Sequence, residues 1–361
     1  MIDPHVHLRD WRQAAKETLR HGLSVAHRAG LDGVFEMPNT DPPLTSREAI
    51  LRRIDDADAA LRGLGIPLFH GLFAGITAVP RQIEEVVRAW RELFPRVVGL
   101  KMFAVHSTGM MGIVGEEEQA LVYRTLAALG YTGVLAVHCE KEALLHPSHW
   151  DPARPASHAR ARPPAAEVAS VDDQLRLARA TGFAGTVHIC HVSTPWSVDL
   201  LRGKHADADP RPAETVAGPG PRVTCGLTPH HALLDAGRME DPGGVLLKVN
   251  PPLRQKPMPS LMLQRLIDGD IDWIESDHAP HTFADKTEGF ASGIPGLPFY
   301  PRFVALLARR GLPSDRLREL THDAICRAFG VSVNLSDRAA EPGLEREYSF
   351  DPFAGTESGA A

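Results

Sequence analysis

Six side chains that can bind a metal ion lie at or just beyond the ends of short apolar segments. They are His5, His7, Lys101, His138, His191 and Asp277. Short apolar segments of this kind are typical of buried strands. In a barrel of parallel strands the carboxyl ends of the strands converge on one rim, so residues about 270 positions apart can share one site. The pattern therefore predicts a metal-dependent enzyme.

The first pair, His5 and His7, has the spacing of two ligands to one ion. Side chains alternate along a strand, so both imidazoles project from the same face. Two ordinary polar histidines would show the same spacing, but His138 and His191 at two further strand ends favour a metal site. Neutral imidazole suits zinc and its neighbours, and four histidines with a carboxylate can hold two ions if another group bridges them.

Lys101, in the segment VVGLKMF, is the candidate bridge, because lysine is scarce in this chain. A buried lysine amine has a depressed pKa and can react with carbon dioxide to form a carbamate, an anion that can span two ions. The alternative is a lysine that extends to solvent or forms an ion pair. Its place among the six residues favours N6-carboxylysine at Lys101.

Several further histidines are close to these positions. His188 lies three residues before His191, which places the two on opposite faces of a regular strand. We therefore select His191 and expect His188 to be structural. His278 should point away from the site that holds Asp277, for the same reason. The pair His230–His231 either supports the site or is solvated.

The four cysteines predict no disulfide framework. Cys139 and Cys190 each adjoin a proposed ligand histidine, so both should point to the opposite face of their strands. We expect all the cysteines to be reduced, and most of them to be packed thiols.

Four polar residues follow strand-like segments and could bind substrate. Arg9 projects to the same face as the histidine pair, Asn39 follows the second strand, and Asn250 and His281 belong to the last part of the chain. Arginine, asparagine and histidine beside a metal site are typical of a clamp for a small, polar, anionic substrate. Taken singly, each is more often a surface residue.

The elements needed to position these residues alternate between strand and helix patterns. Eight strand-like segments cover residues 2–7, 32–38, 67–73, 97–103, 133–139, 185–192, 222–228 and 270–276. Helical periodicities between most of them predict an α/β fold, a (β/α)8 TIM barrel over residues 1–335. Residues 336–361 should form a tail that is packed on the barrel or frayed. We expect residues 104–112 to form a lid and residues 203–221 to form a surface insertion.

Composition narrows the class of protein. The chain has 361 residues and a net charge of −6, which gives no basic surface for nucleic acid. No segment is long and apolar enough to span a membrane, and the first residues lack a signal-peptide pattern. We therefore expect a cytoplasmic enzyme with a small-molecule substrate. The sequence leaves open a homodimer and an association with a pathway enzyme.

Seven motifs together resemble the amidohydrolase superfamily and, within it, the dihydroorotase family. They are HVHLRD, MPNTDPP, KMF, VHCE, HICHVST, KVNPPLR and SDHAPH, and the similarity covers roughly residues 2–300. The resemblance implies the reversible cyclisation of N-carbamoyl-L-aspartate to L-dihydroorotate in de novo pyrimidine biosynthesis, by a hydrolase that acts on cyclic amides. It also implies two zinc ions, with manganese, cobalt or iron as alternatives.

The resemblance assigns a role to each residue of the site. It implies that His5 and His7 bind one ion, that His138 and His191 bind the other, and that carboxylated Lys101 bridges them. Asp277 would be both a ligand and the catalytic base. The implied substrate-binding residues are Arg9, Asn39, Asn250 and His281, with the backbone near Ser292 and Gly293.

The chain departs from its family pattern in two places. Trp11 and Arg12 stand where many members have Pro-Gly, and the N-terminal part of the usual small β-domain should be absent. Some members use an aspartate as the bridge, whereas this sequence favours Lys101. Two other functions stay open: a different cyclic-ureide amidohydrolase (a hydantoinase or allantoinase), and a catalytically inactive barrel that acts as an assembly partner.

Overall fold

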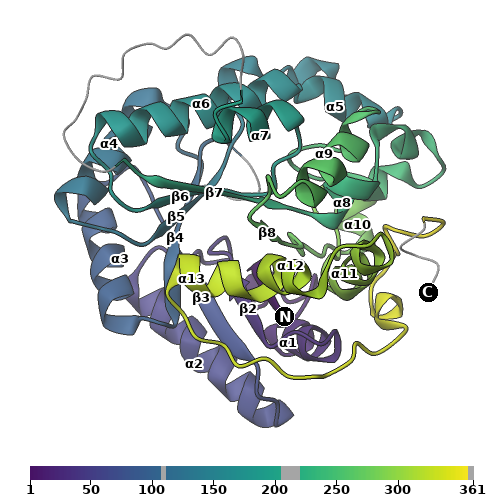
Figure 1. Cartoon of the computed structure of the whole chain (residues 1–361), viewed down its shortest axis with the longest axis horizontal. Coiled ribbons are helices and arrows are strands. Elements are labelled where there is room, and N and C mark those ends of the chain that lie inside the picture. The colour runs from purple at the N-terminus through teal and green to yellow at the C-terminus, as the bar shows by residue number, and fades with distance from the viewer. Residues whose placement is uncertain (107–110, 205–219, 357–361) are drawn as a thin grey trace.

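The strands form one parallel sheet in chain order, and the computed structural model describes residues 1–106, 111–204 and 220–356. They are β1 (Ile2–Val6), β2 (Gly33–Glu36), β3 (Phe69–Gly75), β4 (Val97–Phe103), β5 (Val134–His138), β6 (Thr186–Ile189), β7 (Arg222–Leu227) and β8 (Trp273–Ile274). A parallel bridge between Val6 and His278 joins the two ends of the sheet. The predicted (β/α)8 barrel is confirmed (Figure 1).

Helices follow the strands and cover the outside of the barrel (Figure 1). The longer ones are α1 (Leu19–Arg28), α2 (Arg47–Leu64), α3 (Pro80–Leu93), α4 (Glu116–Ala128), α6 (Pro164–Ala180), α7 (Pro195–Leu201), α9 (Met258–Ile267) and α11 (Tyr300–Arg309). The shorter ones are α5 (His158–Ala161), α8 (Pro229–Leu233), α10 (Phe283–Thr287), α12 (Ser314–Arg318) and α13 (Ala324–Phe329). Their ends follow the sequence: the Ser46 side chain accepts a hydrogen bond from the Ala49 N–H and caps α2, which ends at left-handed Gly65.

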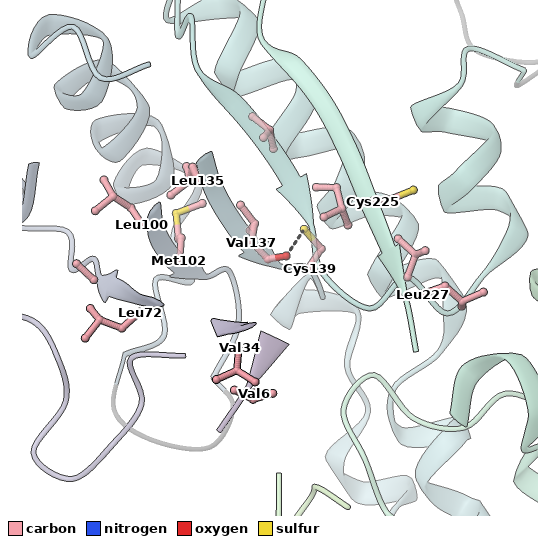
Figure 2. Packing of buried hydrophobic residues seen from close by; sticks show 14 of the residues in the cluster. Val6, Val34, Leu72, Leu100, Met102, Leu135, Val137, Cys139, Cys225 and Leu227 are labelled. Carbon is pink, nitrogen blue, oxygen red and sulfur yellow. Dashed lines mark hydrogen bonds between the residues drawn. The ribbon is translucent and has the colours of Figure 1, made fainter. Parts of the chain in front are cut away.

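Alternate residues of each strand face two different apolar layers. The outward-facing set, which includes Val34, Leu72 and Leu135, packs against the helices (Figure 2). The inward-facing set fills the amino-terminal part of the barrel, where Phe329 of α13 makes edge contacts with Phe35 and Phe73. This apolar plug leaves the carboxyl-terminal part of the barrel for polar side chains.

The described part of the C-terminal tail packs on the outside of the barrel. Arg338 donates a hydrogen bond to the Leu31 carbonyl, and the Tyr348 hydroxyl donates to Glu17 beside α1. Phe353 is buried against Phe299, with ring centroids 4.6 Å apart. These contacts attach residues 336–356 to the barrel.

Two of the segments singled out by sequence fall largely outside the described residues. Residues 107–110 of the expected lid and residues 205–219 of the expected insertion are not described. Among the helices of the described ranges, none combines the length and the apolar character needed to cross a membrane.

Candidate metal centre

The carboxyl-terminal rim of the barrel holds a pocket that gathers the predicted site residues. It is lined by all six predicted metal ligands and by Arg9, Asn39, Phe103, Asn250, Ala279, Ser292 and Gly293. His281 lies beside this lining, with its Nε2 atom 3.2 Å from a terminal nitrogen of Arg9. Parallel strands explain the convergence, because every ligand strand ends at the same rim.

Asp277 sits between the two histidines of β1 and its extension. Its Oδ1 atom is 3.3 Å from Nε2 of His5 and 3.1 Å from Nε2 of His7. The His7 N–H donates to the His278 carbonyl, which closes the barrel at this point. Asp277 has a positive φ of 47°, a strained conformation that directs its carboxylate into the pocket.

The second pair of histidines lies across the pocket. Nδ1 of His138 and Nε2 of His191 are 3.2 Å apart, and the rings of His5 and His191 have centroids 5.1 Å apart. Lys101, on β4, is completely buried, and among the described residues no carboxylate forms an ion pair with it. Its ammonium donates to Sγ of Cys190 at 3.0 Å.

The electrostatics of Asp277, His7 and His191 suit a cation, whereas His5 would have to lose a proton to bind one. Burial lowers the pKa of His5, but contacts with Cys190 and Glu275 outweigh burial and raise it to about 10. Burial raises the pKa of the Asp277 carboxyl, but the hydrogen bond from His7 and the charges of His5 and His7 outweigh burial and hold the pKa below its usual range. Burial lowers the pKa of His7 to about 4 and that of His191 well below its ordinary value. An ionised carboxylate among imidazole nitrogens is a donor set that fits divalent ions of the zinc type.

Two groups of side chains that could hold a metal ion include residues of this pocket. One is His5, His7 and Asp277, and the other is His5, Cys190 and His191. His5 belongs to both groups, so the arrangement could hold two neighbouring ions, and Lys101 lines the same pocket.

The predicted orientation of Cys190 is wrong. β6 ends at Ile189, and His191 has a positive φ of 37°, so the regular alternation of the strand does not extend to His191. Cys190 faces the barrel interior below the pocket, next to Lys101. Cys139 does follow the prediction, because it packs with Val137 on the outward-facing side of the sheet (Figure 2).

The other neighbouring histidines are all hydrogen-bonded inside the protein or buried. His188 faces the barrel interior, where it contacts Thr224 and Glu275, so it does not point away from the side that holds the site. His278 points away from the pocket as predicted and contacts Glu17 at 3.0 Å. His230 and His231 are buried rather than solvated.

Arg9 is the one cationic residue that lines the pocket apart from Lys101. It is 2% exposed, its Nε donates to the Pro280 carbonyl at 3.1 Å, and a terminal nitrogen faces His281. Burial lowers the pKa of Arg9 to about 10, which leaves the guanidinium charged at neutral pH. Among the described residues no carboxylate forms an ion pair with it.

The two asparagines have partners that sequence alone did not suggest. Oδ1 of Asn39 is 2.6 Å from Nδ1 of His7, so this carboxamide fixes the histidine and leaves its Nε2 toward Asp277. Oδ1 of Asn250 faces Nε2 of His158 at 2.9 Å and accepts a hydrogen bond from the Ser292 hydroxyl. Both asparagines therefore have positioning contacts in addition to lining the pocket.

Sequence reasoning missed two buried carboxylates. Glu140 accepts hydrogen bonds from Nε2 of His138 at 2.9 Å and from Arg162, so Nδ1 of His138 is left to face His191. Glu275 lies 3.6 Å from Nδ1 of His5. A carboxylate two residues from a proposed ligand shares its face in a strand, and that spacing was the available signal.

Comparison with known proteins places the chain in a family. Dihydroorotase of Methanosarcina mazei is 32% identical over 340 residues, which cover 92% of this chain and 70% of that protein. Dihydroorotase of Brevibacillus brevis is 32% identical, and the match covers 98% of this chain and 79% of that protein. No protein-family model matches the chain.

Solved structures share the fold. An L-hydantoinase from Arthrobacter aurescens superimposes with a TM-score of 0.75 at 24% identity, over 91% of this chain and 70% of that one. A dihydroorotase from Campylobacter jejuni superimposes with a TM-score of 0.66 at 17% identity, over 92% and 83%. The barrel, the gathered residues and the sequence relatives lead to one conclusion: the chain belongs to the dihydroorotase family.

Proposed function

We propose that this chain catalyses the reversible ring closure of N-carbamoyl-L-aspartate to L-dihydroorotate. Arg9 is the observation that carries the proposal. A buried guanidinium without a carboxylate partner is unfavourable by itself, and it becomes favourable when a ligand supplies the anion. Both the open and the cyclic form of this substrate carry a carboxylate that Arg9 could bind.

A second cation supports an anionic substrate. Nζ of Lys248 donates to the Phe290 carbonyl and to the hydroxyl of Ser292, a residue that lines the pocket. Burial lowers the pKa of Lys248 to about 8. Positive charge at low local dielectric concentrates anions near the pocket and orients them.

The metal centre forms part of this proposal. When bound, two divalent ions would polarise the substrate carbonyl and lower the pKa of water. Zinc is favoured by the donor types, with manganese, cobalt or iron as alternatives. The proposed ligands are His5 and His7 for one ion, His138 and His191 for the other, carboxylated Lys101 as the bridge, and Asp277.

Asp277 would transfer the proton. In ring closure the Asp277 carboxylate accepts a proton from the ureido nitrogen as the nitrogen–carbon bond forms and passes it to the oxygen that leaves the substrate carboxylate. That oxygen departs as hydroxide, and one proton taken up from solvent completes the water. Ring opening runs through the same steps in reverse. The low pKa of Asp277 keeps it ionised and ready to accept.

The substitution Arg9→Met tests the substrate assignment. Loss of a desolvated charge pair should lower kcat/KM for dihydroorotate by roughly 30- to 5,000-fold. Hydrolysis of dihydrouracil, which lacks the carboxylate, should change much less. Arg12→Met is the matched control, because the Arg12 side chain is largely exposed and pairs only with Asp41 at 3.4 Å.

The same assay separates the proposal from its alternatives. Equal losses on both substrates would mean that Arg9 is structural. Faster turnover of hydantoin or allantoin than of dihydroorotate would favour another cyclic-ureide hydrolase, and no turnover at full metal content would favour an inactive barrel. A cyclic ureide without a carboxylate would leave the Arg9 guanidinium without an anion. For this reason we propose dihydroorotate as the substrate.

We also propose a cytoplasmic location. All four cysteines are unpaired, and Cys139, Cys190 and Cys225 are buried as free thiols, which is typical of a reducing compartment.

A further inference from the structure

A second group of metal-type donors lies directly below the pocket, inside the barrel. It consists of His188, Cys190 and Glu275, each at most 2% exposed. One donor atom from each residue lies within 4.8 Å of the other two. Glu275 and His188 are not among the residues that line the pocket above, and Sγ of Cys190 faces Lys101 from beneath.

The fold builds this group from the ends of two strands, β6 and β8, on either side of β7. His188 and Cys190 are two residues apart at the end of β6, so both project into the barrel. Glu275 follows β8 and reaches them across β7, through the space left by the missing side chain of Gly226. A Cβ atom at Gly226 would lie only 2.4 Å from Cδ of Glu275.

The contact between His188 and Glu275 has room for either the proton of an imidazole N–H or a cation in its place. Nε2 of His188 and Oε2 of Glu275 face each other at 3.0 Å, so a proton or a cation must lie between them. Nδ1 of His188 is occupied by the Thr224 hydroxyl at 3.1 Å, which directs Nε2 toward the group.

An independent buried atom also points to this place. Nδ1 of His5 is buried and has no hydrogen-bond partner among the described residues, and it faces Oε1 of Glu275 at 3.6 Å. Buried polar atoms in native proteins are nearly always satisfied, so an unsatisfied one beside three donors indicates a missing ligand.

We propose that His188, Cys190 and Glu275 bind a divalent ion of the zinc type, in addition to the two ions of the proposed centre. A thiolate, an imidazole and a carboxylate select zinc or cobalt over magnesium and calcium, which prefer oxygen donors alone. The ion would neutralise Glu275 and the Cys190 thiolate and would tie β6 to β8 below the reacting groups. A group on the ion would accept the hydrogen of Nδ1 of His5.

Cobalt substitution of the full chain tests this site without relying on turnover. A thiolate bound to Co²⁺ gives a sulfur-to-cobalt charge-transfer band in the near ultraviolet, and carboxylate or imidazole ligands do not. We expect the band in the wild-type protein, and we expect metal analysis to find three ions per chain. Cys190→Ala should lose the band and one ion. Cys139→Ala is the matched control, since Cys139 is also buried beside a ligand histidine but faces outward, and it should keep both.

Further variants separate this site from the pocket above it. Glu275→Gln should weaken binding of the additional ion, while Lys101→Ala should empty the proposed centre and still keep the thiolate band. A band that disappears in Lys101→Ala would mean that Cys190 binds an ion of the upper centre, which would overturn the proposal. Wild-type protein without the band would also overturn it, whatever the variants do. An inactive protein that shows the band would refute the proposed function and leave this inference standing.

Discussion

Two buried polar regions lie on either side of His191, and they differ in how completely their hydrogen bonds are satisfied. On one side, the Glu167 carboxylate accepts hydrogen bonds from the backbone and hydroxyl groups of Ser193 and Thr194 and pairs with Arg254 at 3.4 Å. The described structure leaves no side-chain polar atom of these four residues buried without a partner. This network holds the loop that follows His191.

The pocket on the other side is incomplete. Four buried imidazole nitrogens there and just beside it have no hydrogen-bond partner among the described residues: Nδ1 of His5, Nδ1 of His191, Nε2 of His230 and Nδ1 of His281. Both regions exclude water to a similar degree, so burial alone does not identify a site. The region whose buried polar atoms lack hydrogen bonds is therefore the one that can bind ligands, and the fully hydrogen-bonded region around Glu167 holds it in place.

The largest effect on turnover is expected at Asp277. Asp277→Asn keeps the shape and an oxygen donor but removes the base, so turnover should fall by roughly 10²- to 10⁴-fold. Metal content should remain largely intact. Metal analysis, melting temperature and rates in both reaction directions on this variant measure the effect. Near-normal turnover with lowered stability would mean that Asp277 stabilises the fold, as Glu167 does, and is not the base.

An intermediate effect is expected at Glu140, which belongs to the boundary between the two regions. Glu140→Gln weakens the acceptor for Nε2 of His138 and should lower metal affinity or activity by about 10- to 100-fold. Titration of the metal-free protein with zinc measures this loss. Glu142→Gln is the control, because within the described residues the Glu142 carboxylate accepts its hydrogen bonds from the exposed His106 and not from a proposed ligand. Equal losses of zinc affinity in Glu140→Gln and Glu142→Gln would show that Glu140 does not position His138.

A substitution in the hydrogen-bond network around Glu167 should lower stability and leave metal binding and turnover nearly unchanged. Glu167→Gln leaves the buried Arg254 guanidinium without its counter-charge, which should lower the free energy of unfolding by about 3–5 kcal/mol. The folded fraction should bind metal and turn over substrate at nearly normal rates. Chemical denaturation together with zinc titration checks both parts. If Glu167→Gln lost metal and kept its stability, Glu167 would belong to the metal site and not to the network that stabilises the fold.

The smallest effect on turnover is expected at Glu36, a hydrogen-bonded carboxylate that does not line the pocket. Burial raises its pKa, but the charge of Arg53 and hydrogen bonds from His70 and Arg53 outweigh burial and bring the pKa from 4.5 to about 2. Because the folded pKa is depressed, this stabilisation is fully present above pH 4.5 and is lost as the pH falls toward 2. Glu36→Gln should therefore flatten the acid limb of a plot of melting temperature against pH. An unchanged acid limb would show that other carboxylates dominate it.

The barrel was predictable because the signal for each strand is local. The apolar segment 97–103, for example, is the whole of β4, and the segment 133–139 contains β5 with one residue to spare at each end. The convergence of His5, Lys101 and His138 on one pocket then follows from parallel topology alone.

The details of the lower site were not predictable from periodicity. His188 and Cys190 both face the barrel interior, and His191 joins the pocket next to them through its positive φ, a property of the turn that leaves no mark in the pattern of apolar residues. The contact of Glu275 with His188 crosses an intervening strand, so it depends on tertiary packing. The attachment of the tail through Tyr348 and Phe353 likewise rests on individual contacts within an aperiodic sequence.

The empty position at Gly226 also has an evolutionary consequence. Any side chain there would compete with Glu275 for the same volume, so the two positions cannot vary independently. A descendant that gains a side chain at position 226 should lose bulk at position 275 within the same lineage. One that gains a carboxylate at position 226 could transfer the negative charge from β8 to β7 while the chemistry at the rim continues. Selection would therefore act on this pair of codons jointly.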